Sequence, residues 1–382
     1  MQTEVNLESL LMKWCPNGVK YFWIGELEDS KKISLGRGKV ISKKEIADNP
    51  GSYPVYSSSA TGDGEIGRYG QYMFDDIRLS WSIDGGGKFF YRDAPKYSIT
   101  NVSGWLEVVD KNFIEIKYLY YAMTNEWVKK SYDYTHKAHP SVIRKEYRIP
   151  LPPLPVQQEI VRILDHFTEL TAELTADLTA ELTARRKQYA YYRDALLTFG
   201  GEVEYKSIME IAPPRRGVRV VRNQLEKTGK FPVFQNSIVP LGFYEKSNCG
   251  ANKTFIITAG AAGEVGYSST AFWAADDCYY FDCTDKILDR FLYFVLTSKK
   301  TYLSGQIRKA SIPRLGRNSI EKLVIGIPPL AKQREIVSIL DRFDAFCNDL
   351  TSGLPAEIKA RKQQYEYYRN KLLSFQEAKD DV

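Results

Sequence analysis

Few side chains of this chain are spaced for catalysis or metal binding. His136 and His139 are three positions apart, a spacing that metal ligands use, but no further ligand cluster accompanies them. Asp110, Glu115 and Lys117 offer the carboxylates and lysine that metal-dependent nucleases use, yet the two acids are only five positions apart at an expected helix start. We therefore expect no metal site and no catalytic residue in this chain.

The glycine-rich segment Gly85-Gly86-Gly87-Lys88 is not expected to bind a nucleotide phosphate. It lacks the spacing of a phosphate-binding loop, so a tight turn is the better interpretation. An autonomous aminomethyltransferase would carry an Asn/Asp-Pro-Pro-Tyr/Phe tetrapeptide, and the sequence has none. These observations predict a binding protein without a catalytic centre of its own.

Basic residues collect in the second half of the chain. The formal net charge is +6, with a pI of about 8.8. Residues 205–323 hold 18 Lys/Arg against 10 Asp/Glu, whereas residues 1–150 hold 21 against 19. Acid-free basic blocks favour a polyanionic partner because they neutralise phosphates, although a solvated basic face is the alternative for either block alone. The two blocks contain Arg215, Arg216, Arg219 and Arg222, and Arg290, Lys299, Lys300, Arg308, Lys309, Arg314 and Arg317.

Composition indicates a globular protein of the cytoplasm. Hydrophobic residues make up 43% of the 382 residues and charged residues 26%, and no apolar run is long enough to cross a membrane. The five cysteines are an odd number without Cys-x-x-Cys spacing, so we expect reduced thiols instead of a disulfide framework.

The elements that position the basic side chains come from a duplication. Residues 152–199 match residues 328–375 without a gap, with 26 identities in 48 positions. A fainter match joins the segments between them: Tyr53-Pro54-Val55-Tyr56 with Phe231-Pro232-Val233-Phe234, Lys137-Ala138-His139 with Lys309-Ala310-Ser311, and Val19-x-Tyr21-x-x-Ile24-x-Glu26 with Val203-x-Tyr205-x-x-Ile208-x-Glu210. The order predicted is globule, helix, globule, helix.

Both strongly matched segments have helical apolar spacing. In the first, an apolar stripe from Ile160 to Leu182 continues through three tetrapeptides of the Thr-Ala-Glu-Leu type, which predicts one helix from Pro155 to Phe199. The second keeps the stripe, including Leu350, but Gly353 and Pro355 predict a kink or break. Because neither helix buries its stripe alone, we expect the two to pair.

The predicted fold class is α+β. Two mixed α/β domains are separated by two long helices paired as an antiparallel coiled coil. The predicted division is a first globular domain at 1–150, a spacer helix at 151–200, a second globular domain at 201–325 and a distal spacer helix at 326–382.

These motifs resemble the specificity (S) subunit of type I restriction-modification systems. The resemblance rests on Ile149-Pro150-Leu151-Pro152-Pro153-Leu154 with Gln157-Gln158-Glu159-Ile160-Val161, and on Ile325-Gly326-Ile327-Pro328-Pro329-Leu330 with Gln333-Arg334-Glu335-Ile336-Val337. It extends over essentially the whole chain. It implies two target recognition domains on a helical spacer, reading a bipartite asymmetric DNA target.

The resemblance also implies partners. Two modification (M) subunits would methylate adenine and restriction (R) subunits would cleave DNA, and S-adenosylmethionine, ATP and Mg would belong to those subunits. This chain is expected to be non-catalytic and to have no membrane partner. A self-sufficient nuclease or methyltransferase and a purely structural coiled-coil scaffold remain open as alternatives.

The residues predicted to contact DNA follow from the faint repeat and the basic blocks. Gln and Asn pair with adenine and Arg with guanine in the major groove, whereas many Lys and Arg hold phosphates. In the first globule the candidates are Tyr56, Ser57, Ser58, Arg68, Tyr69, Lys88, Lys137 and His139. In the second they are Arg216, Arg219, Gln235, Asn236, Tyr244, Lys309, Arg314 and Arg317.

Overall fold

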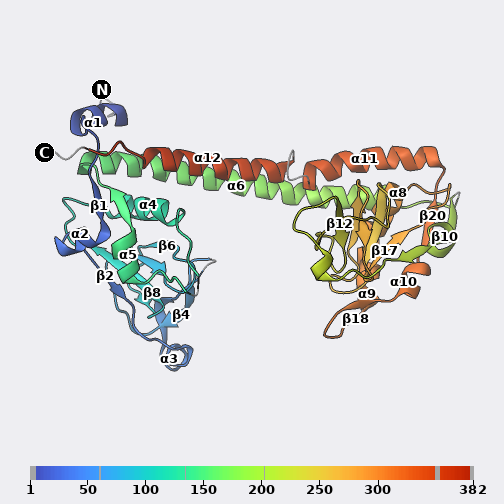
Figure 1. Cartoon of the computed structure of the whole chain (residues 1–382), viewed down its shortest axis with the longest axis horizontal. Helices are drawn as coiled ribbons and strands as arrows, with labels where there is room; N and C mark the ends of the chain where they lie inside the picture. The colour runs from blue at the N-terminus through green and yellow to red at the C-terminus, as the bar shows by residue number, and fades with distance from the viewer. Residues whose placement is uncertain (1–5, 60–61, 134, 202, 349–352, 379–382) are drawn as a thin grey trace. The chain divides into compact units, whose positions relative to one another are not determined.

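A computed structural model describes residues 6–59, 62–133, 135–201, 203–348 and 353–378. Its contacts divide the chain into two compact units (Figure 1). The first comprises Met1–Thr175 and Ala360–Val382, and the second comprises Ala176–Lys359. The grouping differs from the linear four-part division because each long helical segment is shared between the units.

The first unit combines short helices with three small sheets. Its helices outside the long segments are α1 (Leu7–Trp14), α2 (Ile24–Asp29), α3 (Lys43–Asp48), α4 (Ile116–Trp127) and α5 (Pro140–Glu146). Its strands are β1 (Tyr21–Trp23), β2 (Ile33–Arg37), β3 (Pro50–Tyr56), β4 (Glu65–Tyr69), β5 (Arg78–Ser82), β6 (Phe89–Arg92), β7 (Ser98–Ile99), β8 (Ser103–Val108) and β9 (Arg148–Pro150). The strand orders are β2-β8-β5-β6, β4-β3-β7 and β1-β9, and only the β3–β7 pairing is parallel.

The second unit repeats this topology. Its helices outside the long segments are α7 (Ile208–Ile211), α8 (Asp289–Ser298), α9 (Lys300–Gly305) and α10 (Arg317–Glu321), with a 3₁₀ turn at Arg222–Gln224. Its strands are β10 (Glu204–Ser207), β11 (Pro214–Arg216), β12 (Phe231–Phe234), β13 (Gly242–Tyr244), β14 (Lys253–Ile257), β15 (Val265–Ser268), β16 (Trp273–Ala274), β17 (Cys278–Phe281), β18 (Ile307–Arg308), β19 (Arg314–Leu315) and β20 (Val324–Ile327). The orders β11-β17-β14-β15, β13-β12-β16 and β10-β20 correspond one by one to those of the first unit, and β18–β19 is an additional pair. The faint repeat therefore reflects a duplicated fold.

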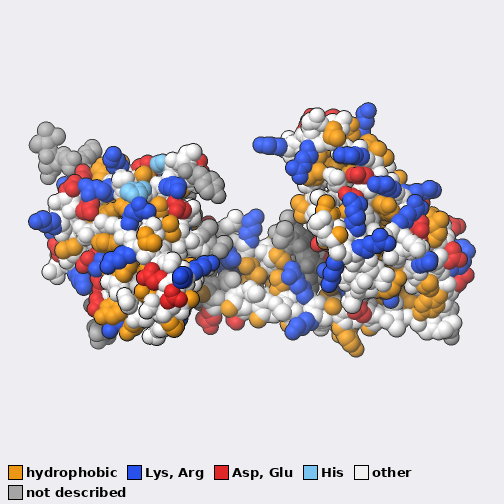
Figure 2. Space-filling model, turned by 90° about the horizontal axis from the view of Figure 1, so that it is seen from below, with side chains coloured by type: hydrophobic (Ala, Val, Ile, Leu, Met, Phe, Trp, Pro, Cys, Tyr) orange, Lys and Arg blue, Asp and Glu red, His pale blue; other side chains and the backbone are white. Residues whose placement is uncertain are grey.

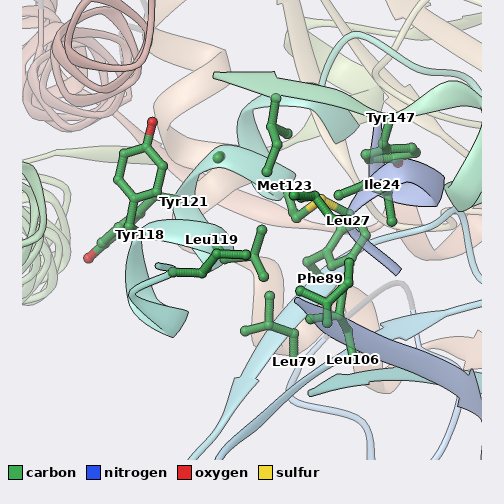
Figure 3. Close-up of a cluster of buried hydrophobic side chains, with 14 of the residues drawn as sticks. Ile24, Leu27, Leu79, Phe89, Leu106, Tyr118, Leu119, Tyr121, Met123 and Tyr147 are labelled. Atoms are coloured by element: carbon green, nitrogen blue, oxygen red, sulfur yellow. The ribbon is translucent and has the colours of Figure 1, made fainter. Parts of the chain in front are cut away.

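Each unit buries its own apolar core. In the first, Leu79, Phe89 and Leu106 of the sheet meet Leu119 of α4 (Figure 3), and the cluster continues into Ile160 of the long helix. In the second, buried residues join α7, the sheet, α8 and the long helices, among them Ile208, Ile256, Phe281, Phe291, Leu292, Phe294, Ile336 and Leu340. Residues 114–130 and 290–304 have helical apolar spacing, and residues 255–258 and 279–281 consist of β-branched or aromatic residues. Helices α4, α8 and α9 and strands β14 and β17 form in these segments.

The first long segment is a single helix and the second is two helices. α6 runs without a break over Leu154–Leu196. The second segment forms α11 (Leu330–Asn348) and α12 (Leu354–Leu372), with Gly353 and Pro355 at the start of the latter, as the sequence led us to expect. Leu350 of the predicted stripe lies outside the described residues.

The long helices pair in antiparallel fashion within each unit. In the first unit, the ring of Phe167 lies 5.8 Å from that of Tyr368, and Thr168 Oγ1 lies 2.9 Å from Tyr365 Oη. In the second unit, α6 meets α11: the rings of Tyr192 and Phe343 are 5.9 Å apart, and Arg185 lies over Phe346. In both places rising numbers on α6 meet falling numbers on its neighbour, which confirms the predicted orientation.

The C-terminal segment closes the first unit. The backbone N–H of Val19 donates to Gln376 O at 2.8 Å, and Tyr21 Oη donates to Phe375 O at 3.1 Å. The second unit makes the corresponding tyrosine bond within continuous chain, from Tyr205 Oη to Phe199 O at 2.8 Å. Each globule thus holds the end of the long helical segment that reaches its first strand.

Candidate nucleic-acid interface

An Arg-Gly pair stands at the same place in both globules. Arg37 donates from Nε and Nη2 to the carbonyl of Asn101, at 3.0 and 2.7 Å. Arg216 donates from Nε to the carbonyl of Asp276 at 3.0 Å. Both arginines end the first strand of the four-stranded sheet and are exposed. We call residues 37–38 and 216–217 the Arg-Gly turns.

The glycines of the Arg-Gly turns are fixed by close backbone approach. A Cβ on Gly38 would lie 2.0 Å from the carbonyl oxygen of Ile99, and one on Gly217 would lie 2.1 Å from that of Ala275. The backbone N–H groups of the two glycines donate to Ser103 O at 3.1 Å and to Cys278 O at 3.0 Å. Only glycine fits here, so both arginines leave the sheet along the same path.

In the first unit, two of four neighbouring predicted residues contact the turn between β5 and β6. Ser58 Oγ is hydrogen-bonded to Ser82 Oγ and accepts from the backbone N–H of Asp84 at 3.2 Å. Lys137 forms an ion pair with the same Asp84 at 2.9 Å. Because Asp84 neutralises it, Lys137 presents less net charge to a polyanion than the sequence suggests. The other two, Ser57 and Lys88, bond to neighbouring loops: Ser57 Oγ accepts from Thr100 at 2.9 Å and Lys88 donates to Gly62 O at 3.2 Å.

Tyr56 covers a buried arginine. The guanidinium of Arg92 lies 3.6 Å from the Tyr56 ring centre and donates to Ser80 Oγ at 2.8 Å and to Asp63 O at 2.7 Å. Burial lowers the pKa of Arg92 and raises the pKa of Tyr56. Tyr56 therefore has a structural contact on one face of its ring, which holds the loop that follows β3.

The other candidates of the first unit differ in accessibility. Arg68 is exposed but pairs with Glu65 at 3.0 Å. His139 caps α5, where its imidazole accepts from the first turn. Tyr69 was predicted to face DNA, and this is wrong: its side chain is 5% exposed and its hydroxyl donates to Glu45 at 2.9 Å. Tyrosine patterning alone did not distinguish this core position from a surface one.

In the second unit, three predicted residues surround Asp276 and Asp277. Besides Arg216, Gln235 donates from its amide to Asp276 Oδ1 at 3.4 Å, and Arg314 Nη1 lies 3.7 Å from Asp277 Oδ1. The second unit thus brings a guanidinium, an amide and a further guanidinium to one place. Both kinds of side chain are able to read base edges or hold phosphates. On the face that Figure 2 shows, Lys and Arg side chains gather over the second unit.

Asn236 and Tyr244 are held by neighbouring elements. The Asn236 carbonyl accepts from the backbone N–H of Ala261 at 2.9 Å, and its side chain is exposed. Tyr244 packs edge-on against Trp273, with ring centres 5.1 Å apart, and belongs to a small apolar cluster. Asn236 therefore remains available to a ligand, while Tyr244 mainly supports the sheet.

The remaining basic candidates are exposed. Arg219 lies in the loop after β11, and Lys309 lies between β18 and β19. Arg317 is in α10 and pairs with Glu321 at 2.6 Å. The sequence matched Lys137 with Lys309, but the helix N-caps match it with Arg314. Lys137 lies two residues before His139, the N-cap of α5, and Arg314 lies two residues before Gly316, the N-cap of α10.

A buried glutamine fastens the long helix to the first globule. Gln157 is fully buried, and its amide donates to Pro152 O at 2.7 Å and to Phe113 O at 2.9 Å. Its carbonyl accepts from the backbone N–H of Glu115 at 2.9 Å. The second unit repeats all three bonds through Gln333, which contacts Pro328 O, Lys286 O and the N–H of Leu288.

An ion pair adds to each junction. Lys117 of α4 pairs with Asp165 of α6 at 2.7 Å, and Tyr121 donates to the same carboxylate at 2.6 Å. In the second unit Arg290 pairs with Asp341 and Asp344, at 2.7 and 3.1 Å. In both units, therefore, hydrogen bonds of a buried glutamine amide and an ion pair from a globule side chain, Lys117 or Arg290, hold the start of the long helical segment against the globule.

Known proteins match this arrangement. The family described as Type I restriction modification DNA specificity domain matches residues 16–184 and again residues 201–360. The chain belongs to this family. A Mycoplasma pneumoniae protein named as a type I specificity subunit is 31% identical over 367 residues, covering 92% of this chain and 97% of the relative. A type I restriction enzyme specificity subunit of Escherichia coli is 33% identical over 298 residues, covering 70% of this chain and 72% of the relative.

Solved structures support the fold of this specificity subunit. The S subunit of a type I restriction-modification system from M. genitalium aligns with a TM-score of 0.52 at 18% identity, covering 93% of this chain and 96% of that one. A chain from a structure on complex assembly and conformational transition of the type I system aligns with a TM-score of 0.63 at 14% identity, covering 94% and 98%. These structures confirm the predicted fold class, and the family model and the relatives confirm the predicted family.

The nuclease-like set that the sequence analysis considered and set aside is dispersed in this specificity subunit. Asp110 pairs with Lys32 at 2.6 Å, whereas Lys117 is turned to α6. His136 stacks on Tyr132 and lies 3.2 Å from Glu146. Within the described ranges, the acidic, histidine and cysteine side chains form no group suited to a metal ion, and no helix has the length and apolar character to cross a membrane.

Sequence reasoning missed Arg37. Arg216 was a candidate because it lies in a basic block of the second half. Arg37 was passed over because residues 1–150 as a whole hold basic and acidic residues in nearly equal number, although residues 30–44 around it contain six Lys/Arg and no acid. The available signal was the Arg-Gly dipeptide itself, which recurs at 37–38 and 216–217. Its neighbours are too different for the faint repeat to extend over it, and only the strand register makes the two equivalent.

Proposed function

We propose that this chain is the DNA-reading subunit of a type I restriction-modification complex and recognises a bipartite, asymmetric sequence. The supporting observation is the contrast within the duplication. The framework and the helix junctions of the two units are the same, while the side chains on the loops after β3 and β12 differ. Two unlike readers on a common framework suit two unlike half-sequences, read mainly in the major groove, where each base pair is distinguishable.

The long helices would set the unread gap between the half-sequences. Each four-residue unit of α6 adds about 6 Å of helix, comparable to one or two base-pair steps. In this proposal the chain carries no catalytic group. Two M subunits, with S-adenosylmethionine, methylate adenine within the target, and R subunits, with ATP and Mg, cleave DNA.

The test is a methylation map of cells that co-express the chain with its M subunits. Single-molecule methylome sequencing is expected to give one bipartite motif with a fixed gap. Deletion of residues 175–178 is expected to shorten the gap and to leave both half-sequences unchanged. Asp177→Glu, which keeps the length and completes the Thr-Ala-Glu-Leu repeat, is the matched control and should retain the wild-type gap. An altered half-sequence in the deletion variant would contradict the spacer role.

A further inference from the structure

The structure assigns a further pair of DNA contacts: we propose that Arg37 and Arg216 each bind one backbone phosphate, one in each half of the target. This inference rests on the proposed function and deepens it. It adds Arg37, which lies outside the two basic blocks of the second half, and gives Arg216 a role in holding DNA instead of reading it.

The first argument is the state of the two guanidinium groups. Each is held by a backbone carbonyl, that of Asn101 or of Asp276, and each is exposed. Among the described residues, no carboxylate lies within ion-pairing distance of either, whereas neighbouring Arg215 is paired with Asp282 at 2.6 Å. A guanidinium that is already oriented, with donors to spare and its charge unmatched, is suited to phosphate oxygens.

The second argument is equivalence. Arg37 lies opposite Gly104 in the antiparallel pairing of β2 with β8, and Arg216 lies opposite Tyr279 in that of β11 with β17. In both units the residue just before this partner, Ser103 or Cys278, supplies the carbonyl that accepts from the glycine N–H. The carbonyls that accept from the two guanidinium groups, those of Asn101 and Asp276, are also at equivalent positions. Each lies two residues after the strand partner of Tyr56 or Phe234 in the parallel pairings, which is Ile99 or Ala274.

Equivalence decides the ligand. A group that is identical in two globules with different loops cannot carry the difference between two half-sequences. It is suited to the component that every DNA sequence shares, which is the phosphate backbone. The glycines beside both arginines keep this contact at a constant place relative to each sheet, and the variable loops then reach the bases.

The experiment measures how binding of duplex DNA depends on salt. The chain, assembled with its M subunits, is titrated with a duplex that carries the mapped motif and with a random-sequence duplex. Arg37→Gln and Arg216→Gln are each expected to reduce the slope of log K against log salt by about 0.9, and the double variant by about 1.8. Both duplexes should weaken by the same factor, and the methylation motif should not change. Arg37→Lys and Arg216→Lys keep the charge and should retain the slope.

Matched controls are Arg215→Gln and Arg144→Gln, because the exposed Arg215 and the half-buried Arg144 are already paired with acids. They should leave the slope unchanged. An unchanged slope in both Arg37→Gln and Arg216→Gln, with wild-type unfolding temperatures, would overturn the inference, and so would a changed methylation motif. If the wild-type complex yields no bipartite motif, the proposed function fails, while the random-sequence duplex still tests the phosphate contact. If a Gln variant unfolds, the corresponding Lys variant provides the test. It keeps the positive charge and should retain the slope of log K against log salt, and a lower slope would overturn the proposal.

Discussion

The two units agree where the chain must hold its shape and differ where it can meet a ligand. Gln157 and Gln333 make the same three buried bonds, although the surrounding globules share few side chains. At the end of β3, in contrast, Tyr56 covers the buried Arg92, while Phe234 at the end of β12 stacks on Phe255 at 4.5 Å. The comparison teaches that the duplication retains its junctions and changes the support beneath its loops.

The largest expected effect comes from the Arg-Gly turns. Gly38→Ala and Gly217→Ala place a Cβ against backbone carbonyls, so each should destabilise its own unit by about 3 kcal/mol. Hydrogen exchange, followed unit by unit, measures the loss. Gly70→Ala and Gly250→Ala, where the added Cβ has ordinary contacts or open space, are the controls. A loss in only one of the two units would break the equivalence of the turns.

The glutamine junctions should give the next largest effect. Gln157→Ala and Gln333→Ala each leave one backbone N–H and two carbonyls, one of them buried and the others partly buried, without their side-chain partner, which costs about 2 kcal/mol. Denaturant unfolding with exchange readouts in each unit gives the two values. Gln188→Ala, at a half-buried position of α6 where the side-chain carbonyl accepts an exposed bond from Arg185, serves as a control for losing a glutamine side chain. Costs that differ by more than about twofold would show that the two junctions are not equivalent.

The smallest expected effect sharpens the difference between α2 and α7, the equivalent helices that follow β1 and β10. Glu210 accepts from both the hydroxyl and the backbone N–H of Ser207, and the hydroxyl is the main reason that its pKa is lowered. Trp23 stands at the corresponding place in the first unit and donates only its backbone N–H, to Glu26 at 2.9 Å.

Because the folded-state pKa of Glu210 is lowered, its contribution to stability is present above the unfolded value of about 4.3 and is lost as pH falls through the folded value. Ser207→Ala should raise the Glu210 pKa toward its ordinary value, as measured by carbon NMR of the side-chain carboxyl group. The variant should be less stable than the wild type at neutral pH and equal to it at strongly acidic pH. A titration curve that does not move would assign the lowered pKa to the backbone contact instead.

Local patterns predicted the helices well. The apolar stripe and the uninterrupted tetrapeptides gave α6 to within a few residues, and Gly353 with Pro355 gave the division into α11 and α12. Periodicity is a property of neighbouring residues, so it survives without knowledge of the tertiary structure. Short strands were also found where β-branched and aromatic residues run together, as at β14 and β17.

Site residues were harder because their environment is made by distant segments. Tyr69 resembles the other tyrosines in sequence, yet its hydroxyl is buried against α3. Lys137 and Arg314 are basic in sequence but are partly neutralised by Asp84 and Asp277. Neither burial nor an ion pair between segments has a local signature that a single sequence displays.

The amino-acid sequence by itself determined the duplication, the long helices with their break, and the family, because each of these is written in residues close together or in strict repeats. Only the tertiary structure decided which surface groups are equivalent. Arg37 and Arg216 correspond because strands far apart in the chain pair in one register and bring a carbonyl to each guanidinium. Hydrogen bonds between distant strands fix that register, and the sequence around the two arginines has diverged too far to reveal it.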